Sequence, residues 1–251
     1  MRFRGKVALV TGGSRGIGRA ISTMFAQEGA AIAVNYRNRT EAAEDTIGEL
    51  RDLGARAIAI KADVRDDQRV RDMVSRVVDE LGGLDFIVSN AASGSNKPAM
   101  DLSTAGWDWT LNINARALLS LAQAAVPFMR TRGGGRIVSI SSLGANRVLP
   151  NYTSVGVSKA ALEALTRYLG VELAPERILI NCISASTVET DALEHFPNAP
   201  EMLAAARERT PAGRMVRPED IAVAVRFLCS PDAEMIVGQT LLIDGGFSLP
   251  I

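Results

Sequence analysis

The chain has 251 residues, of which 47% are hydrophobic and 22% charged, enough for one large α/β domain with a substantial core. Its 28 basic and 28 acidic residues cancel, which argues against recruitment of nucleic acid or an anionic membrane by overall charge. The opening segment, MRFRGKVALVTGG, has too short an apolar run for a signal peptide or a membrane span, so we expect a cytoplasmic protein. Cys182 and Cys229 lack the spacing of a zinc or redox motif, so we expect two free structural thiols and no metal site.

Short runs rich in Val and Ile alternate with amphipathic stretches along the chain. The expected strands are VALVT, AIAVNY, RAIAIKAD, LDFIVSNA, GRIVSISS, RILINCIS and QTLLIDGG, with helical segments between the first six and before the last. This alternation predicts an α/β, single-domain doubly wound Rossmann fold over residues 1–251, with a seven-stranded, mainly parallel sheet flanked by helices. The longest irregular region, from about 184 to 218, is expected to form a substrate lid.

A glycine-rich loop follows the first expected strand. The segment VALVTGGSRGIGRAI places Gly12, Gly16 and Gly18 between that strand and a helix. Glycine lets backbone amides approach a pyrophosphate closely, and the helix N-terminus supplies positive potential. Since the loop directly follows a buried strand, we expect a nucleotide site rather than a simple tight turn.

The charges after the second strand indicate which nucleotide binds. This strand ends AVNYRNR, without an acidic residue to accept hydrogen bonds from an adenosine ribose diol, which disfavours NAD. Arg15, Arg37 and Arg39 carry guanidinium groups suited to a 2′-phosphate, although each can also be an ordinary solvated charge. Arg15 and Arg37 together favour NADPH.

Tyr152 and Lys159 stand seven residues apart in NYTSVGVSK. On a helix, seven steps of about 100° bring two side chains back to one face, roughly 10 Å apart. One side chain can then hold a cofactor while the other meets a substrate.

The glycine spacing resembles the TGxxxGxG pattern of the short-chain dehydrogenase/reductase family, and the resemblance extends over essentially the whole chain. It implies catalytic roles for Asn114 in LNINA, Ser142 in SISS and Lys159, an adenine contact for Asp63 in KADV, and a cofactor site at Asn90 in SNAAS. With the loop and the arginines, the expected cofactor-binding set is Gly12, Ser14, Arg15, Gly16, Ile17, Gly18, Arg37, Arg39, Asp63, Val64, Asn90, Ala91, Lys159, Val188 and Thr190.

The family's usual tyrosine, four residues before the lysine, is replaced here by Val155. The segments NAAS, WDWTLNINARALL, YTSVGVSKAALEALTRYL and TDALEHFPN are similar to the enoyl-acyl-carrier-protein reductase III group, in which Tyr and Lys are seven apart. The sequence departs from related proteins at two places. Ala185 and Ser186 replace the family's usual Pro-Gly after the sixth strand, and Ala145 stands where many other enoyl reductases have a further tyrosine. Tyr152 is therefore the sole tyrosine expected near the reaction.

This resemblance implies NADPH-dependent reduction of the 2,3 double bond of an enoyl thioester, carried by acyl carrier protein in fatty-acid synthesis or by coenzyme A. Hydride arriving at the β-carbon pushes negative charge onto the thioester oxygen, and Tyr152 is the expected donor to that oxygen. Lys159 is expected to bind the nicotinamide ribose and hold a positive charge beside it, with Asn114 supporting it through water. Ser142 either contacts the substrate or caps the next turn.

Two other functions remain open. A carbonyl reductase of the same fold, acting on 3-oxoacyl groups or in specialised biosynthesis, would need Tyr152 or Ser142 as its acid. A sensor that binds NADPH without catalysis would explain an altered active site, but not the retention of Asn114, Ser142 and Lys159 at catalytic spacing. Leu143, Leu149, Leu193 and Phe196 are candidate acyl-tunnel or core residues, and His195 is expected in the lid. The helices over 114–129 and 160–173 are apolar enough to pair between subunits, and the family resemblance implies a homotetramer.

Overall fold

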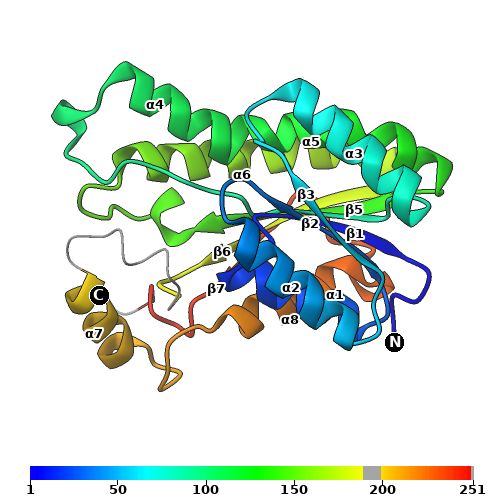
Figure 1. Cartoon of the computed structure of the whole chain (residues 1–251). Helices are drawn as coiled ribbons and strands as arrows, with labels where there is room; N and C mark the ends of the chain where they lie inside the picture. The colour runs from blue at the N-terminus through cyan, green and yellow to red at the C-terminus, as the bar shows by residue number, and fades with distance from the viewer. Residues whose placement is uncertain (189–198, 250–251) are drawn as a thin grey trace.

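The computed structural model describes residues 1–188 and 199–249. Within them, seven strands form one sheet in the order β3-β2-β1-β4-β5-β6-β7, and every neighbouring pair is parallel (Figure 1). The strands are β1 (Val7–Thr11), β2 (Ala31–Tyr36), β3 (Ala57–Lys61), β4 (Phe86–Ser89), β5 (Gly135–Ser142), β6 (Ile178–Ala185) and β7 (Thr240–Ile243). All seven expected strands are therefore confirmed.

Helices cover both faces of the sheet, as a doubly wound Rossmann fold requires. Figure 1 shows α1, α2 and α8 on one face and α3, α5 and α6 on the other. The helices are α1 (Gly16–Gln27), α2 (Thr40–Asp52), α3 (Asp67–Leu81), α4 (Thr104–Leu111), α5 (Ala117–Thr131), α6 (Thr153–Leu173), α7 (Ala199–Arg209) and α8 (Pro218–Cys229), with short turns η1 (Ala99–Asp101), η2 (Asn112–Arg116), η3 (Leu143–Ala145), η4 (Ala174–Glu176) and η6 (Pro231–Ala233).

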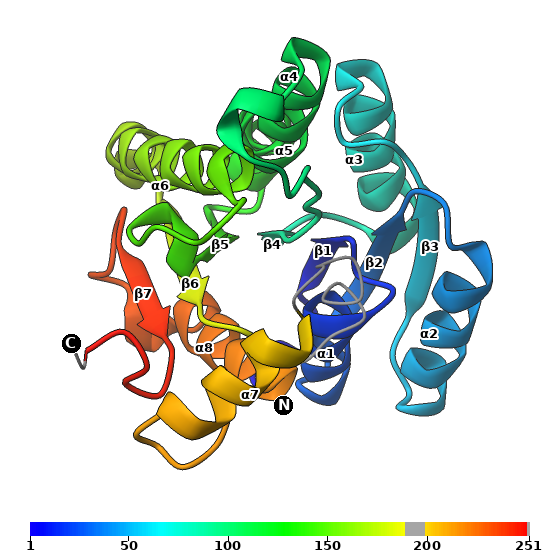
Figure 2. The same ribbon diagram turned by 90° about the vertical axis from the view of Figure 1, so that its left-hand side faces the viewer.

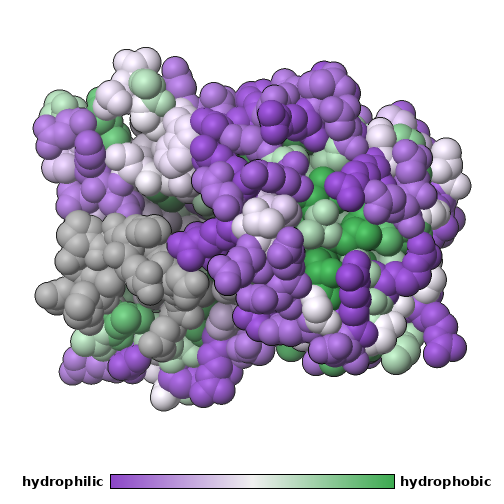
Figure 3. Space-filling view, viewed as in Figure 1, coloured by the Kyte–Doolittle hydropathy of each residue, from purple (hydrophilic) through white to green (hydrophobic). Residues whose placement is uncertain are grey.

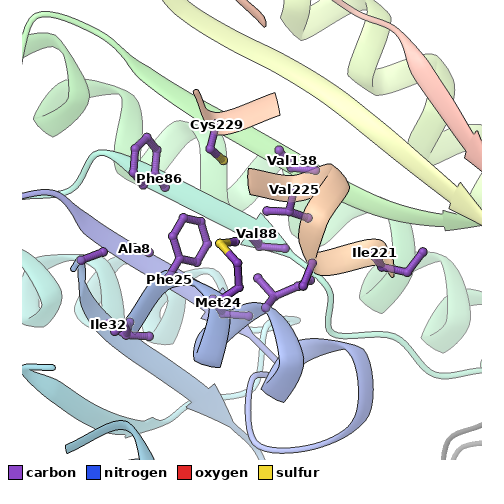
Figure 4. Close-up of a cluster of buried hydrophobic side chains, with 14 of the residues drawn as sticks. Ala8, Met24, Phe25, Ile32, Phe86, Val88, Val138, Ile221, Val225 and Cys229 are labelled. Carbon is purple, nitrogen blue, oxygen red and sulfur yellow. The ribbon is translucent and has the colours of Figure 1, made fainter. Parts of the chain in front are cut away.

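Side chains of each strand alternate between two cores. In β1, Ala8 and Val10 join the cluster under α1 and α8, while Val7 and Leu9 join the cluster under α3, α5 and α6. Figure 4 shows Phe25 and Phe86 of the first cluster, whose stacked rings lie 5.5 Å apart between centroids. Burial on both faces explains why the strands read as continuous apolar runs.

The outer surface follows from this layering. Figure 3 shows mainly hydrophilic side chains over the helices, with apolar side chains visible between the two helix layers at the β3 edge. None of the helices in the described ranges is both long and apolar enough to cross a membrane. Cys182 and Cys229 are buried and free, as expected. In the same ranges no group of His, Cys, Asp and Glu is arranged to hold a metal ion.

The sheet reverses its winding between β1 and β4, and this topological switch point opens a crevice at the carboxyl ends of the strands. Figure 2 looks onto this end of the sheet, with α7 beside it. The region expected to be irregular, 184–218, is partly regular, because β6 continues to Ala185 and α7 occupies Ala199–Arg209. Its role as a lid stays a prediction.

Candidate active site

A cavity of about 480 Å³ lies at the switch point. It is lined by the glycine loop, the ends of β2 and β3, the residues after β4, and the end of β5. The structure brings together there most of the expected site: Gly12, Ser14, Arg15, Gly16, Ile17, Gly18, Arg37, Arg39, Asp63, Val64, Asn90, Ala91, Ser142, Tyr152 and Lys159. Asn114 and Val188 do not line it, and Thr190 lies outside the described residues.

The glycine loop has the backbone geometry that a pyrophosphate site needs. Gly12 and Gly16 have φ values of +60° and +49°, in the left-handed region that favours glycine. A Cβ at Gly18 would lie only 2.2 Å from the carbonyl oxygen of Gly12, so this helix position requires glycine for close packing. No side chain caps the start of α1, which leaves its first amides available to an anion.

Two asparagines, the buried Asn35 and the partly buried Asn90, hold this loop in place. Asn90 Nδ2 donates to the carbonyl oxygens of Thr11 at 2.9 Å and Gly12 at 3.1 Å. Asn35 Oδ1 accepts from the Gly12 amide at 3.4 Å, and its Nδ2 donates to the carbonyl of Ala62 at 3.0 Å. Asn35 was missed by the sequence analysis, although a polar residue in an otherwise apolar buried strand is a usable signal.

Arg15 is the clearest candidate for binding a phosphate. Its Nη1 is buried and has no hydrogen-bond partner within the described residues, although it borders the cavity. A buried guanidinium nitrogen without a partner is costly, and a phosphate oxygen would satisfy it. Arg37 and Arg39 are exposed at the far end of the cavity. The residues present therefore fit a dinucleotide, and the preference for its 2′-phosphorylated form stays a prediction.

Asp63 is already held by two arginines. Its Oδ2 accepts from Arg65 Nη2 at 2.6 Å and lies 3.3 Å from Arg37 Nε. The Arg65 hydrogen bond holds the pKa of Asp63 below its usual range, so the carboxylate is ionised at neutral pH. Arg65 was not expected in the site, and the contact of Asp63 with adenine stays a prediction.

Tyr152 and Ser142 form a hydrogen-bonded pair at the carboxyl end of β5. The Tyr152 hydroxyl donates to Ser142 Oγ at 3.3 Å, and the same Oγ accepts from the Gly144 amide at 3.3 Å. Ser142 therefore caps the turn η3, as one reading of the sequence expected, and also contacts the tyrosine. Burial raises the pKa of Tyr152, so its hydroxyl keeps its proton at neutral pH.

The helix bearing the lysine starts one residue after Tyr152. α6 begins at Thr153, and Tyr152 has the non-helical angles φ −108° and ψ 12°. The spacing argument thus placed Tyr152 on the helix, whereas it is the residue that precedes it. Tyr152 and Lys159 still line the same cavity, because the chain enters the helix directly from that residue.

Lys159 is almost completely buried, with 6% of its surface exposed. Its Nζ donates to the carbonyl oxygen of Ile140 at 2.7 Å. Burial lowers the pKa of Lys159 to about 8, against the opposing influence of Cys182 and Glu163. The side chain is therefore mainly cationic at neutral pH, and it is fixed at the end of β5 beside the cavity.

Asn114 lies behind the cavity in a π-helical turn, η2. Its Oδ1 accepts from the Ser93 amide and its Nδ2 donates to Ser158 Oγ, both at 2.9 Å. It therefore ties the segment after β4 to α6 next to Lys159, and does not contact the lysine directly. π-Helical turns occur frequently at functional sites. Support of Lys159 through water stays a prediction.

Val155 occupies the place of the family's usual tyrosine and is packed into the protein. It is 8% exposed, and a Cβ built on Gly94 would lie 2.1 Å from Val155 Cγ2. The backbone of Gly94 therefore lies directly against Val155. Position 155 has no side chain that could donate a proton to a substrate. Tyr152 lines the same cavity as Lys159, and its role as the tyrosine of the reaction stays a prediction.

The remaining expectations have mixed outcomes. Val188 packs its side chain into the core and forms an isolated parallel bridge with Val216, so its contact with nicotinamide stays a prediction. Leu143 is buried and Leu149 partly buried. Leu193, His195 and Phe196 lie outside the described residues.

Comparison with known proteins gives the family. Residues 12–248 match the family described as Enoyl-(Acyl carrier protein) reductase. A short-chain dehydrogenase from Burkholderia cenocepacia J2315, solved in complex with NADP, is 38% identical and superimposes with a TM-score of 0.91 over 98% of this chain and 99% of that one. The chain belongs to the short-chain dehydrogenase/reductase family. It is therefore an oxidoreductase with a site for a nicotinamide dinucleotide.

Other members of this family differ in substrate and cofactor. The 1-cyclohexenylcarbonyl-CoA reductase of Streptomyces collinus is 37% identical over 248 residues, covering 98% of this chain and 88% of that protein. A 7α-hydroxysteroid dehydrogenase, solved with NADH and 7-oxo glycochenodeoxycholic acid, is 35% identical with a TM-score of 0.93 over 98% of this chain and 95% of that one. One relative is named for a coenzyme A thioester and the other was solved with a 7-oxo steroid, so similarity of this degree does not fix the substrate.

Proposed function

We propose that this chain is an NADPH-dependent reductase of the 2,3 double bond of an enoyl thioester, in fatty-acid synthesis. The observation that carries the proposal is that Tyr152 and Lys159 line one cavity while the position of the usual carbonyl-reducing acid holds the buried Val155. The family match and the similarity to a cyclohexenylcarbonyl-CoA reductase support it.

Bound NADPH supplies the hydride that adds to the β-carbon of the enoyl group. As this bond forms, the C=C electron pair moves toward the thioester and negative charge collects on its oxygen. The Tyr152 hydroxyl donates to that oxygen, and its raised pKa keeps the proton in place until it is needed. Because the hydroxyl has a single hydrogen, it would turn from Ser142 Oγ, which accepts it at 3.3 Å, toward the thioester oxygen when substrate binds. A proton from solvent then completes the α-carbon.

Lys159 and the arginines act on the cofactor. The Lys159 ammonium, anchored to Ile140, offers its remaining hydrogens to the nicotinamide ribose and stabilises negative charge nearby. Arg15, with its unpartnered Nη1, and Arg37 at the end of β2 would hold the 2′-phosphate that distinguishes NADPH from NADH.

The carrier of the acyl group is acyl carrier protein or coenzyme A, and the working unit is a homotetramer. One support for assembly is that Tyr168 and Val171 of α6 are 73% and 74% exposed, which is unusual for apolar side chains on the same helix.

Carbonyl reduction is the second candidate, favoured by the similarity to the 7α-hydroxysteroid dehydrogenase solved with a 7-oxo substrate. In this case the Tyr152 and Ser142 hydroxyls would both donate to the carbonyl oxygen.

Parallel assays separate these functions. NADPH oxidation is followed with matched crotonyl and acetoacetyl thioesters, each on acyl carrier protein and on coenzyme A, with NADH as control. The proposal expects strong preference for crotonyl and for NADPH; preference for acetoacetyl would overturn it. Tyr152→Phe should lower kcat by about 10² or more while the Kd for NADPH stays nearly unchanged.

A further inference from the structure

A buried carboxylate lies one helical turn beyond the lysine on α6. Glu163 is 5% exposed. Its Oε1 accepts from Ser141 Oγ at 2.6 Å, and its Oε2 accepts from Asn146 Nδ2 at 3.1 Å. Because both oxygens act as acceptors, and the first bond has the short length of a hydroxyl on a carboxylate, these contacts fit the ionised form.

The two donors belong to the segment that holds the catalytic groups. Ser141 stands between Ile140, whose carbonyl accepts from Lys159, and Ser142, whose hydroxyl accepts from Tyr152. Asn146 directly follows the turn η3 that Ser142 caps. Glu163 thus ties the end of β5 and the following turn to the helix that carries Lys159.

The surroundings of Lys159 contain few other charges. Its titratable neighbours, besides Glu163, are Cys182 of β6 and Tyr152, which lines the same cavity. Burial raises the pKa of the Cys182 thiol to about 11, and that of Tyr152 is raised too, so both are neutral when Lys159 titrates. In the described parts of the chain no carboxylate forms a direct ion pair with Lys159, which leaves Glu163 as the carboxylate that acts on it.

We propose that Glu163 is a positioning residue, whose buried carboxylate is the counter-charge that keeps Lys159 protonated at the end of β5. Two opposite charges in a poorly solvated interior interact strongly even without direct contact. The electrostatic role does not depend on the substrate; only its consequence for turnover rests on the proposed function.

The test observes the lysine itself. The chain has four lysines, Lys6, Lys61, Lys97 and Lys159, so ε-¹³C-lysine NMR gives four signals, and Lys159→Arg identifies the one from Lys159. Titration of the unliganded protein should show its midpoint near pH 8. Glu163→Gln, which keeps the shape but removes the charge, should move this midpoint down by about one pH unit or more. Glu172→Gln, at an exposed glutamate of the same helix, should leave it unchanged.

Further measurements separate charge from packing. Ser141→Ala removes one hydrogen bond but keeps the carboxylate, and should shift the midpoint less than Glu163→Gln does. A Glu163→Gln protein with a lowered Tm but an unshifted Lys159 midpoint would overturn the proposal. If Glu163→Gln does not fold, the wild-type midpoint decides: a value of about 7 or below contradicts the proposal, and a higher value supports it.

The same variants connect the charge to catalysis. The alkaline limb of the kcat/KM profile should move to lower pH in Glu163→Gln, in step with the NMR midpoint, and stay in place in Glu172→Gln. If no enoyl or carbonyl substrate is turned over, the proposed function fails while the NMR result still decides the role of Glu163.

Discussion

The ring of Tyr152 lies directly over Gly144. A Cβ at residue 144 would be 2.5 Å from Cε1 and 2.6 Å from Cδ1 of that ring, closer than any such contact allows. The Gly144 amide also donates to the same Ser142 oxygen that accepts from the Tyr152 hydroxyl. This one glycine therefore fixes both the plane of the ring and its hydrogen-bond partner.

Gly144→Ala should displace the tyrosine ring while leaving the cofactor cavity intact. A misplaced donor of about 1 Å can cost up to about 10²-fold in rate, so we expect kcat to fall by at least about 10-fold with the Kd for NADPH unchanged. Gly48→Ala is the control: residue 48 lies in α2 with no atom within 4 Å of an added Cβ, and stability should be equal or higher. Full turnover by Gly144→Ala would mean that the ring position observed here is not the working one.

Arg15→Gln tests the proposed preference for NADPH over NADH. Loss of a charge-assisted hydrogen bond to the 2′-phosphate should raise the Kd for NADPH by about 10-fold or more, and change the Kd for NADH little, as measured by fluorescence titration. Arg71→Gln, an exposed arginine of α3, is the matched control and should affect neither. An equal rise in the Kd for NADPH and for NADH would indicate that Arg15 binds the pyrophosphate instead.

Val155→Tyr would place a tyrosine where the family usually has one, but the backbone at Gly94 leaves no room for its ring. We expect a loss of about 1–3 kcal/mol in the free energy of unfolding from overpacking, without new activity on acetoacetyl thioesters. Val157→Tyr places the same ring at a site that is 42% exposed, and denaturant unfolding should show little change. A stable Val155→Tyr protein that reduces 3-oxo substrates would contradict the packing argument.

Activity should depend on pH through Lys159. Because burial lowers its pKa to about 8, the cationic form dominates below pH 8 and is lost as the pH rises through that value. The kcat/KM measured from pH 6 to 9.5 should therefore be flat on the acid side of this step and decline above it. A constant value up to pH 9.5 would show that the lysine charge is not required.

The sequence predicts the sheet and the nucleotide loop well, because both depend on local patterns. Runs such as VALVT are apolar since both faces of each strand are covered, and Gly18 is fixed by a contact six residues away in the same segment. Pairings between distant elements could not be predicted in this way. The bond between Ser141 and Glu163 and the packing of Gly94 on Val155 appear only once β5, α6 and the segment after β4 meet.

The sequence did not predict where Tyr152 lies relative to the start of α6. The seven-residue spacing is correct for a shared cavity, yet Tyr152 precedes the helix, because its backbone has the non-helical angles φ −108° and ψ 12°. Spacing specifies which residues can face each other and not where a helix begins.

Transfer of deuterium tests the central claim most directly. Wild-type protein is incubated with NADPH deuterated at the transferring C4 position and with crotonyl thioester, and the product is analysed by mass spectrometry and NMR. Hydride addition to the β-carbon predicts a butyryl thioester with one deuterium at C3, and greatly reduced formation by Tyr152→Phe. An unreduced crotonyl thioester, together with 3-hydroxybutyryl product labelled at C3 from acetoacetyl thioester, would contradict enoyl reduction and identify a carbonyl reductase.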